Sequence, residues 1–276
     1  MSQFWSRLQR SPSAVVGLAV VLIALSIAII GPLLAGSGSE MGAEAFCPPG
    51  PGCIFGSDDL GRDMFVRMAR GAQVSLIVGF AAAICSCIIG ILIGSVAGYT
   101  GGVTDELLMR VSEGFQIIPQ FFLAILIVAL FGPSLTKIVI VIGILSWPST
   151  ARIVRAEFLR LRSTDFVAAA EVAGASRVRI IFKEILPNAL PPVIVNASLQ
   201  IASAILTEAN LSFLGLGDPD KISWGQLLFS AQPFLAQAWW MAVFPGCAIL
   251  ITTLGFNLLG DGLNDLLDPR QNGNRR

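Results

Sequence analysis

Long apolar stretches separated by short polar segments dominate the pattern of hydrophobic and polar positions along this 276-residue chain. A helix needs about 20 mostly apolar residues to cross the hydrocarbon of a membrane. Six stretches reach or approach that length, and the pattern therefore predicts an all-α membrane protein with six transmembrane helices. The predicted spans are Ala14–Ala35, Val74–Tyr99, Phe115–Phe131, Lys137–Ile153, Ala189–Ala209 and Ala238–Leu259.

Prolines mark the two least regular spans. Trp147 and Pro148 are expected to interrupt the fourth span, because proline lacks the N–H that a helix interior uses. Pro119 stands near the start of the third span, where a helix tolerates proline better.

Composition agrees with a membrane protein. Hydrophobic residues make up 54% of the chain and charged residues 13%, against about 25% charged residues in a soluble domain. The chain has no histidine, which excludes histidine-based catalysis, metal ligation and proton relays. We expect membrane lipid to surround it and nucleic acid to play no part.

The loop charges predict the orientation. Thirteen of the 18 Lys and Arg residues lie in segments that are cytoplasmic if the N-terminus is cytoplasmic. Lys and Arg concentrate in cytoplasmic loops, so both termini are expected inside. Residues 36–73 and 211–237 then form two long outer loops, of which the second is expected to be re-entrant or to cap the bundle. We divide the chain into residues 1–72, an N-terminal helix with its outer loop, and residues 73–276, a core.

Cys47 and Cys53 frame a turn rich in proline and glycine, "CPPGPGC", in the first outer loop. Outside the cytoplasm such a pair can form a disulfide. Two free thiols in a flexible loop are the alternative, and the sequence leaves both open.

A different pattern occupies the predicted cytoplasmic segment "FVAAAEVAGASRVRIIFKEILPN", Phe166–Asn188. An alanine-rich helix is followed by a glycine turn, a basic helix and Leu186-Pro187, which should stop the helix before the fifth span. Small exposed side chains next to basic residues favour a helix that docks into a groove of another protein. The alternative is a solvated basic loop that only fixes topology. The predicted docking residues are Ala168, Ala169, Ala170, Gly174, Ala175, Ser176, Arg177, Leu186 and Pro187.

One face of the fifth span is polar. Asn196, Gln200, Ser203 and Thr207 recur at helical spacing, and Glu208 adjoins them at the outer end. Polar groups in a membrane helix face protein or a water-filled cavity. These residues are therefore candidates for the wall of a translocation pathway, or else for hydrogen bonds between helices. Glu208 in particular could instead form a structural ion pair or bond loop backbone.

Gly90, Gly94 and Gly98 form two overlapping G-x-x-x-G units in the second span. Such a ridge lets another helix approach closely. Packing within the chain is the default interpretation, and dimer packing is the alternative.

Several chemistries are absent from the sequence. There is no G-x-x-x-x-G-K-[ST] phosphate loop, so we expect no ATP site of that type, no catalytic residues and no metal site. No acidic residue stands in the middle of a span, which leaves an ion-coupled transporter little to work with.

The docking segment resembles the cytoplasmic loop of permease subunits of bacterial ABC importers. Ala169-Ala170, Gly174 and Leu186-Pro187 match that family's pattern in register, whereas Ala168 and Glu184 depart from its glutamate and isoleucine. Further blocks resemble the dipeptide/oligopeptide/nickel branch, in particular the dipeptide permease C type. They are "GSDDLGRD", "GAQVSL", "AGYTGG", "LSFLGLG", "SWGQLL" and "NLLGDGLNDLLDPR".

The resemblance implies a type I ABC importer permease fold in the bacterial cytoplasmic (inner) membrane. It implies a homologous second permease that completes the pore, two ATPase subunits that bind ATP and Mg, and an extracytoplasmic solute-binding protein. It places the coupling helix near 165–185. Peptides are the expected substrate, with nickel chelates, glutathione or another small solute as alternatives. An ion-coupled secondary transporter is the competing class.

Overall fold

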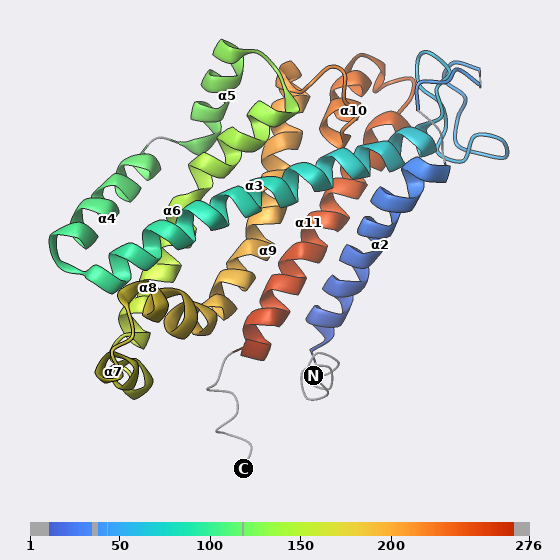
Figure 1. The fold of residues 1–276 in the computed structure, drawn as a ribbon. Helices are drawn as coiled ribbons and strands as arrows, with labels where there is room; N and C mark the ends of the chain where they lie inside the picture. Colours follow the sequence, from blue (N-terminus) through green and yellow to red (C-terminus); the bar gives the residue numbers. More distant parts are fainter. Residues whose placement is uncertain (1–10, 35–37, 43, 118, 268–276) are drawn as a thin grey trace.

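The computed structural model describes residues 11–34, 38–42, 44–117 and 119–267, and it is a bundle of helices with no strand among these residues (Figure 1). The helices, in chain order, are α2 (Pro12–Leu34), α3 (Met64–Thr100), α4 (Gly102–Ile117), α5 (Gln120–Phe131), α6 (Leu135–Leu161), α7 (Asp165–Val172), α8 (Arg177–Arg179), η1 (Ile180–Ile185), α9 (Leu186–Leu211), η2 (Ser212–Leu216), α10 (Trp224–Ala231), η3 (Gln232–Phe234) and α11 (Trp240–Leu267). The all-α prediction is confirmed.

Five of the helical runs in the described residues are long and apolar enough to cross a membrane: α2, α3, α6, α11 and the continuous run Arg177–Leu216. The predicted first span ends at Ala35, which lies outside the described residues. α3 begins at Met64, so the boundary that we drew between residues 72 and 73 falls inside a helix.

The third predicted span, Phe115–Phe131, is wrong as a single helix. Phe115 belongs to α4, and α5 starts after Pro119, with the two helix axes bent by 77°. Pro119 is the N-cap of α5 with φ −57° and ψ 116°, so the helix begins after the proline instead of running through it. The candidate for a sixth span is therefore the bent pair α4 and α5.

The expected interruption of the fourth span is also wrong, because α6 runs unbroken through Pro148. The side-chain amide of Gln120 in α5 donates a hydrogen bond to the Leu145 carbonyl at 2.7 Å. Trp147 is buried and meets Phe115 edge to face at 5.5 Å. A neighbouring helix thus supplies polar and aromatic contacts where proline weakens the ladder of backbone bonds.

The most extensive helix contact joins α3 to α6. A Cβ atom on Gly90 or Gly98 would lie 2.5 Å from the Cβ of Thr150 or Phe158, and one on Gly94 would overlap the Ala151 carbonyl oxygen. The glycine ridge therefore packs against another helix of the same chain, which agrees with the default interpretation of the sequence.

α2 lies along α11 (Figure 1). Here too small residues set the distance, since a Cβ on Gly255 of α11 would lie 2.5 Å from Cγ1 of Val20, and Gly262 faces Ala14. The first helix is thus integral to the bundle.

The two ends of the bundle carry different elements. The start of α2, the end of α11 and the α7 helix lie at one end in Figure 1, and the 38–63 loop and α10 lie at the other. A short helix, α10, stands inside the second loop that the sequence marked as re-entrant or capping.

We predict that Gly94→Ala lowers the free energy of unfolding by about 1–3 kcal/mol, because the added methyl group must displace the α6 backbone. Gly246→Ala in α11 is the matched control, since no atom lies within 4 Å of its added Cβ. The control should be neutral, or stabilising by up to about 1 kcal/mol. Thermal unfolding of both variants in detergent is the measurement, and equal midpoints would contradict the close packing.

Candidate functional site

The predicted docking segment is a helix, a glycine turn and a second helix. Val167 of α7 is 1% exposed and packs with Phe158, Ile180 and Ile185 in one apolar cluster. This anchor holds α7 against the end of α6 and the start of the fifth-span helix.

The opposite side of the segment is exposed. Ala168, Ala169, Gly174, Ser176 and Arg177 are all exposed, and Ala170 and Ala175 are half-buried. Two larger apolar side chains that the sequence analysis did not single out stand with them, Val172 at 91% exposed and Val178 at 66%. Single valines beside alanines give no periodic signal, so only the structure reveals this apolar content.

Gly174 adopts φ +77°, a conformation that glycine accepts readily. A Cβ added there would meet no atom of this chain within 4 Å. Its requirement inside the chain is therefore conformational, and the space beside it is open.

The prediction that Leu186-Pro187 ends the helix is wrong. The helix continues from Arg177 through Leu211, and a π-helical stretch, Ile180–Ile185, precedes Pro187. Leu186 N–H bonds the Ile181 carbonyl, and the Asn188 side chain donates to the Glu184 carbonyl at 2.7 Å. The wider turn and this side-chain bond accommodate the missing proline N–H.

The N-terminal half of the polar face of α9 is bonded to α6. Asn196 Nδ2 donates to Thr150 Oγ1 at 3.1 Å, and Gln200 Nε2 donates to Ser149 Oγ at 2.9 Å and to Thr150 Oγ1 at 2.8 Å. Gln200 Oε1 is buried without a hydrogen-bond partner among the described residues. These two residues hold helices together, as the helix-contact alternative states.

The C-terminal half of that face differs. Ser203 is exposed, and Thr207 is half-buried with its hydroxyl donating to the Ser203 carbonyl at 2.8 Å. Among the described residues, neither side chain hydrogen-bonds to another helix. Both side chains can therefore contact solvent or a molecule bound next to α9.

Glu208 turns away from this face and is 1% exposed. Its Oε1 accepts hydrogen bonds from Ser212 Oγ and Ser223 Oγ, both at 2.7 Å, and Oε2 accepts from Ser75 Oγ at 3.5 Å. Ser223 is also the N-cap of α10 and accepts from Gln226 N–H at 3.1 Å. The carboxylate thus links α3, α9 and α10 through hydroxyl groups, rather than through the ion pair or backbone bond that the sequence suggested.

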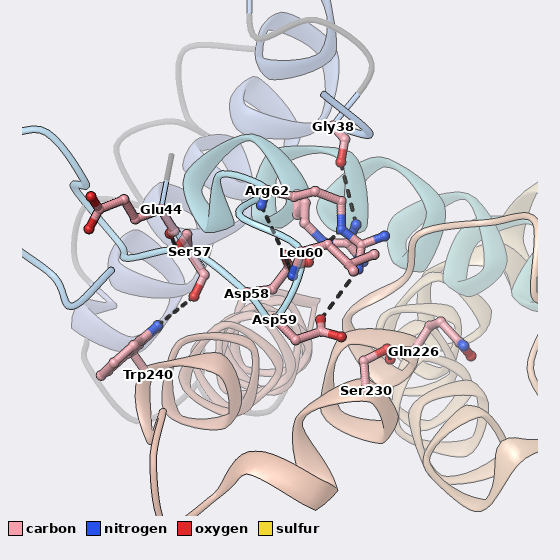
Figure 2. A network of polar contacts seen from close by, with 11 residues as sticks. Gly38, Glu44, Ser57, Asp58, Asp59, Leu60, Arg62, Gln226, Ser230 and Trp240 are labelled. Carbon is pink, nitrogen blue, oxygen red and sulfur yellow. Dashed lines mark hydrogen bonds and ion pairs between the residues drawn. The ribbon is translucent and has the colours of Figure 1, made fainter. Parts of the chain in front are cut away.

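A second buried carboxylate organises the loop between α2 and α3 (Figure 2). Asp58, 1% exposed, accepts from the backbone N–H groups of Leu60 and Arg62 and pairs with Arg62 Nε at 2.6 Å and Arg67 Nε at 3.5 Å. Next to it, Trp240 Nε1 of α11 donates to the Ser57 carbonyl at 3.0 Å. The network ties the "GSDDLGRD" block to the start of α11, and its acidic and basic spacing was the signal that could have predicted it.

In the same loop, the Sγ atoms of Cys47 and Cys53 are joined as a disulfide. Gly50 and Cys53 exchange backbone hydrogen bonds within the turn that the disulfide closes. Ser57 connects this turn to the Asp58 network. Its hydroxyl accepts a hydrogen bond from Cys47 N–H at 2.8 Å and donates one to the Glu44 carbonyl at 2.6 Å.

At the other end, Arg155 of α6 makes a two-pronged ion pair with Asp105 of α4, at 2.5 and 2.6 Å. Arg162 also donates to the Tyr99 carbonyl at the end of α3, at 3.1 Å. The described residues contain no group of three or more His, Cys, Asp or Glu that could hold a metal.

Five helical runs that are long enough to span a membrane, together with one bent pair of helices, define an α-helical integral membrane protein. Residues 90–273 match the family described as binding-protein-dependent transport system inner membrane component, and residues 1–49 match the N-terminal transmembrane domain of oligopeptide transport permease C. The chain belongs to this family of inner-membrane ABC transport permeases.

Three relatives illustrate the similarity. A putative peptide transport system permease protein of Brucella suis is 44% identical over 96% of this chain and 90% of the relative. The dipeptide transport system permease protein DppC of Alkalihalophilus pseudofirmus is 41% identical over 96% and 88%. The oligopeptide transport system permease protein OppC of Bacillus subtilis is 38% identical over the same shares.

Among solved structures, the chain resembles the inward-facing MetNI methionine ABC transporter. The TM-score is 0.59 at 20% identity, covering 72% of this chain and 95% of the other. This likeness establishes the permease fold.

We predict that Glu208→Ala lowers the free energy of unfolding by about 1–3 kcal/mol, because buried serine hydroxyls lose their acceptor. Glu208→Gln keeps one acceptor oxygen and should lose less. Glu171→Ala, which removes an exposed glutamate, is the control. Thermal unfolding in detergent orders the three variants, and an Ala variant as stable as the control would refute a linking role for Glu208.

Proposed function

We propose that this chain forms half of the translocation pore of an ATP-driven importer for di- or oligopeptides. The similarity of nearly its whole length to peptide, dipeptide and oligopeptide permeases carries the proposal. Nickel chelates, glutathione or another small solute are alternative substrates for the same importer type.

The proposed partners are a homologous second permease, two ATPase subunits and an extracytoplasmic solute-binding protein. ATP and Mg belong to the ATPase subunits, because the chain has no phosphate-binding loop of its own. In this arrangement the chain is not an enzyme.

The anchored segment between residues 165 and 187 supports a coupling role. Val167 fixes α7 to the bundle, while Ala168, Ala169, Val172 and Gly174 remain exposed. A small, apolar surface on a fixed helix suits insertion into a groove of an ATPase. Leu186 and Pro187 belong to the supporting helix rather than to the contact.

With this segment inside, the start of α2 and the end of α11 are cytoplasmic too, since all three share one end of the bundle. The disulfide then lies on the outer side, where thiols oxidise more readily. The excess of Lys and Arg supports the same orientation.

For the pathway, we assign the outer residues Ser203 and Thr207 to the pore wall and Asn196 and Gln200 to its support. The assignment rests on exposure, because the inner pair is bonded to α6 and the outer pair is not. Glu208 positions α10 at the outer mouth.

An uptake assay tests the function. The four subunits are reconstituted in vesicles with the binding protein and a labelled dipeptide. We expect uptake to require ATP and to persist when ionophores collapse the proton and sodium gradients. Uptake without ATP, driven by an ion gradient, would establish the secondary-transporter alternative.

The same assay tests the pore wall after Cys85, Cys87 and Cys247 are replaced. A water-soluble thiol reagent should block uptake through Ser203→Cys but not through Ile194→Cys, a half-exposed position on the opposite side of α9. Equal sensitivity of the two variants would remove Ser203 from the wall.

Gly174→Asp tests the coupling. Aspartate tolerates a positive φ, so the effect comes from the bulk and charge placed in open space. We expect about tenfold less ATPase to co-purify, which corresponds to about 1.4 kcal/mol of binding. Gly174→Asn adds similar bulk without charge and should lose less.

Gly52→Asp is the matched control, because Gly52 also has a positive φ and open surroundings but lies in the outer loop. Normal co-purification of Gly174→Asp would refute the coupling proposal.

A further inference from the structure

A cavity of ≈ 400 Å³ lies between α2, α3, α10 and α11. Its floor is made by Met68 and Trp224, both buried, and its walls include Ile27, Ile30 and Ala248. No residue discussed for coupling or for the pathway lines it. The cavity is therefore separate from those sites.

The described residues that line the cavity offer no free polar side-chain group. The one hydroxyl of the lining, Ser26 Oγ, donates to the Leu22 carbonyl at 2.7 Å. The indole N–H of Trp224 donates to the Met68 carbonyl at 3.1 Å. Cavities without polar partners stay dry, so an apolar occupant meets no competition from bound water.

The cavity opens sideways. Ile27 and Ile30, about half exposed, form its edge on α2, a helix long and apolar enough to span the membrane. On the loop side Phe55 covers it, stacked on Phe244 at 4.4 Å and edge to face with Phe65 at 5.4 Å. The opening thus faces hydrocarbon, whereas aromatic rings shield it from the outer aqueous side.

We propose that this cavity binds an acyl chain of a membrane phospholipid. A membrane-spanning helix edges the opening, so lipid tails are the molecules that reach it, and the lining matches them in polarity. The bound chain bridges α2 and α3 near the outer loop. It fills space that packing between the helices leaves empty.

The test uses the full chain in vesicles that contain phosphatidylethanolamine with a photoreactive diazirine near the middle of one acyl chain. After illumination, cross-linked peptides are mapped. We expect labelling concentrated at Met68 and Ile30, with Ala248→Phe reducing it about tenfold by filling the cavity, a loss equivalent to about 1.4 kcal/mol. Ser26→Phe fills the cavity from its exposed edge and should act likewise if Ala248→Phe folds poorly.

Leu250→Phe is the matched control, because it adds a ring to α11 at an exposed position outside the lining. It should leave labelling unchanged. Labelling spread evenly over exposed α2 residues, or unaffected by both filling variants, would overturn the proposal. A photoreactive methionine analogue at position 68 in the assembled importer gives a second check. Cross-links from it to the second permease would also overturn the proposal, since a protein would then occupy the cavity.

Discussion

The close approach of α3 and α6 is the constraint on which the rest of the bundle depends. Within a bilayer, helices gain little from the hydrophobic effect by associating, and close packing and hydrogen bonds must hold them together. Gly90, Gly94 and Gly98 let the α6 backbone come so near that a single methyl group would not fit. That contact fixes Ser149 and Thr150, and these hydroxyls in turn receive the amides of α9. One ridge of glycines thereby sets the position of the helix that carries the polar face.

The length of the apolar stretches was sufficient to predict five of the spans. Whether a helix ends at a proline could not be predicted from the neighbouring sequence. Pro119, Pro148 and Pro187 all lack a backbone N–H donor. A helix begins only after Pro119, whereas helices continue through Pro148 and Pro187. The side chain of Gln120, from another helix, donates a hydrogen bond to α6 near Pro148. A π-helical stretch precedes Pro187. The outcome depends on what neighbours provide, and a single stretch of sequence does not contain that information.

The same distinction applies to the candidate site. Helical spacing predicted which residues of α9 share a face, but the partners of that face come from α6, about 50 positions away in the chain. The alanines and Gly174 predicted the exposed surface of the docking segment. Its anchor, Val167 against Ile180 and Ile185, depends on the fold of the segment itself and became visible only in the structure.

The two ends of the molecule are held together by different interactions, and both buried carboxylates lie at the same end. Asp58 draws in two arginines and two backbone N–H groups, and Glu208 draws in hydroxyls from three elements. Burying a carboxylate is costly unless such partners surround it, so each acid stabilises only one arrangement of its loop. The end that carries the 38–63 loop and α10 is therefore cross-linked by polar contacts between distant parts of the chain. The segment around α7 at the other end is anchored by a small apolar cluster instead, and this leaves most of its polar and small side chains exposed.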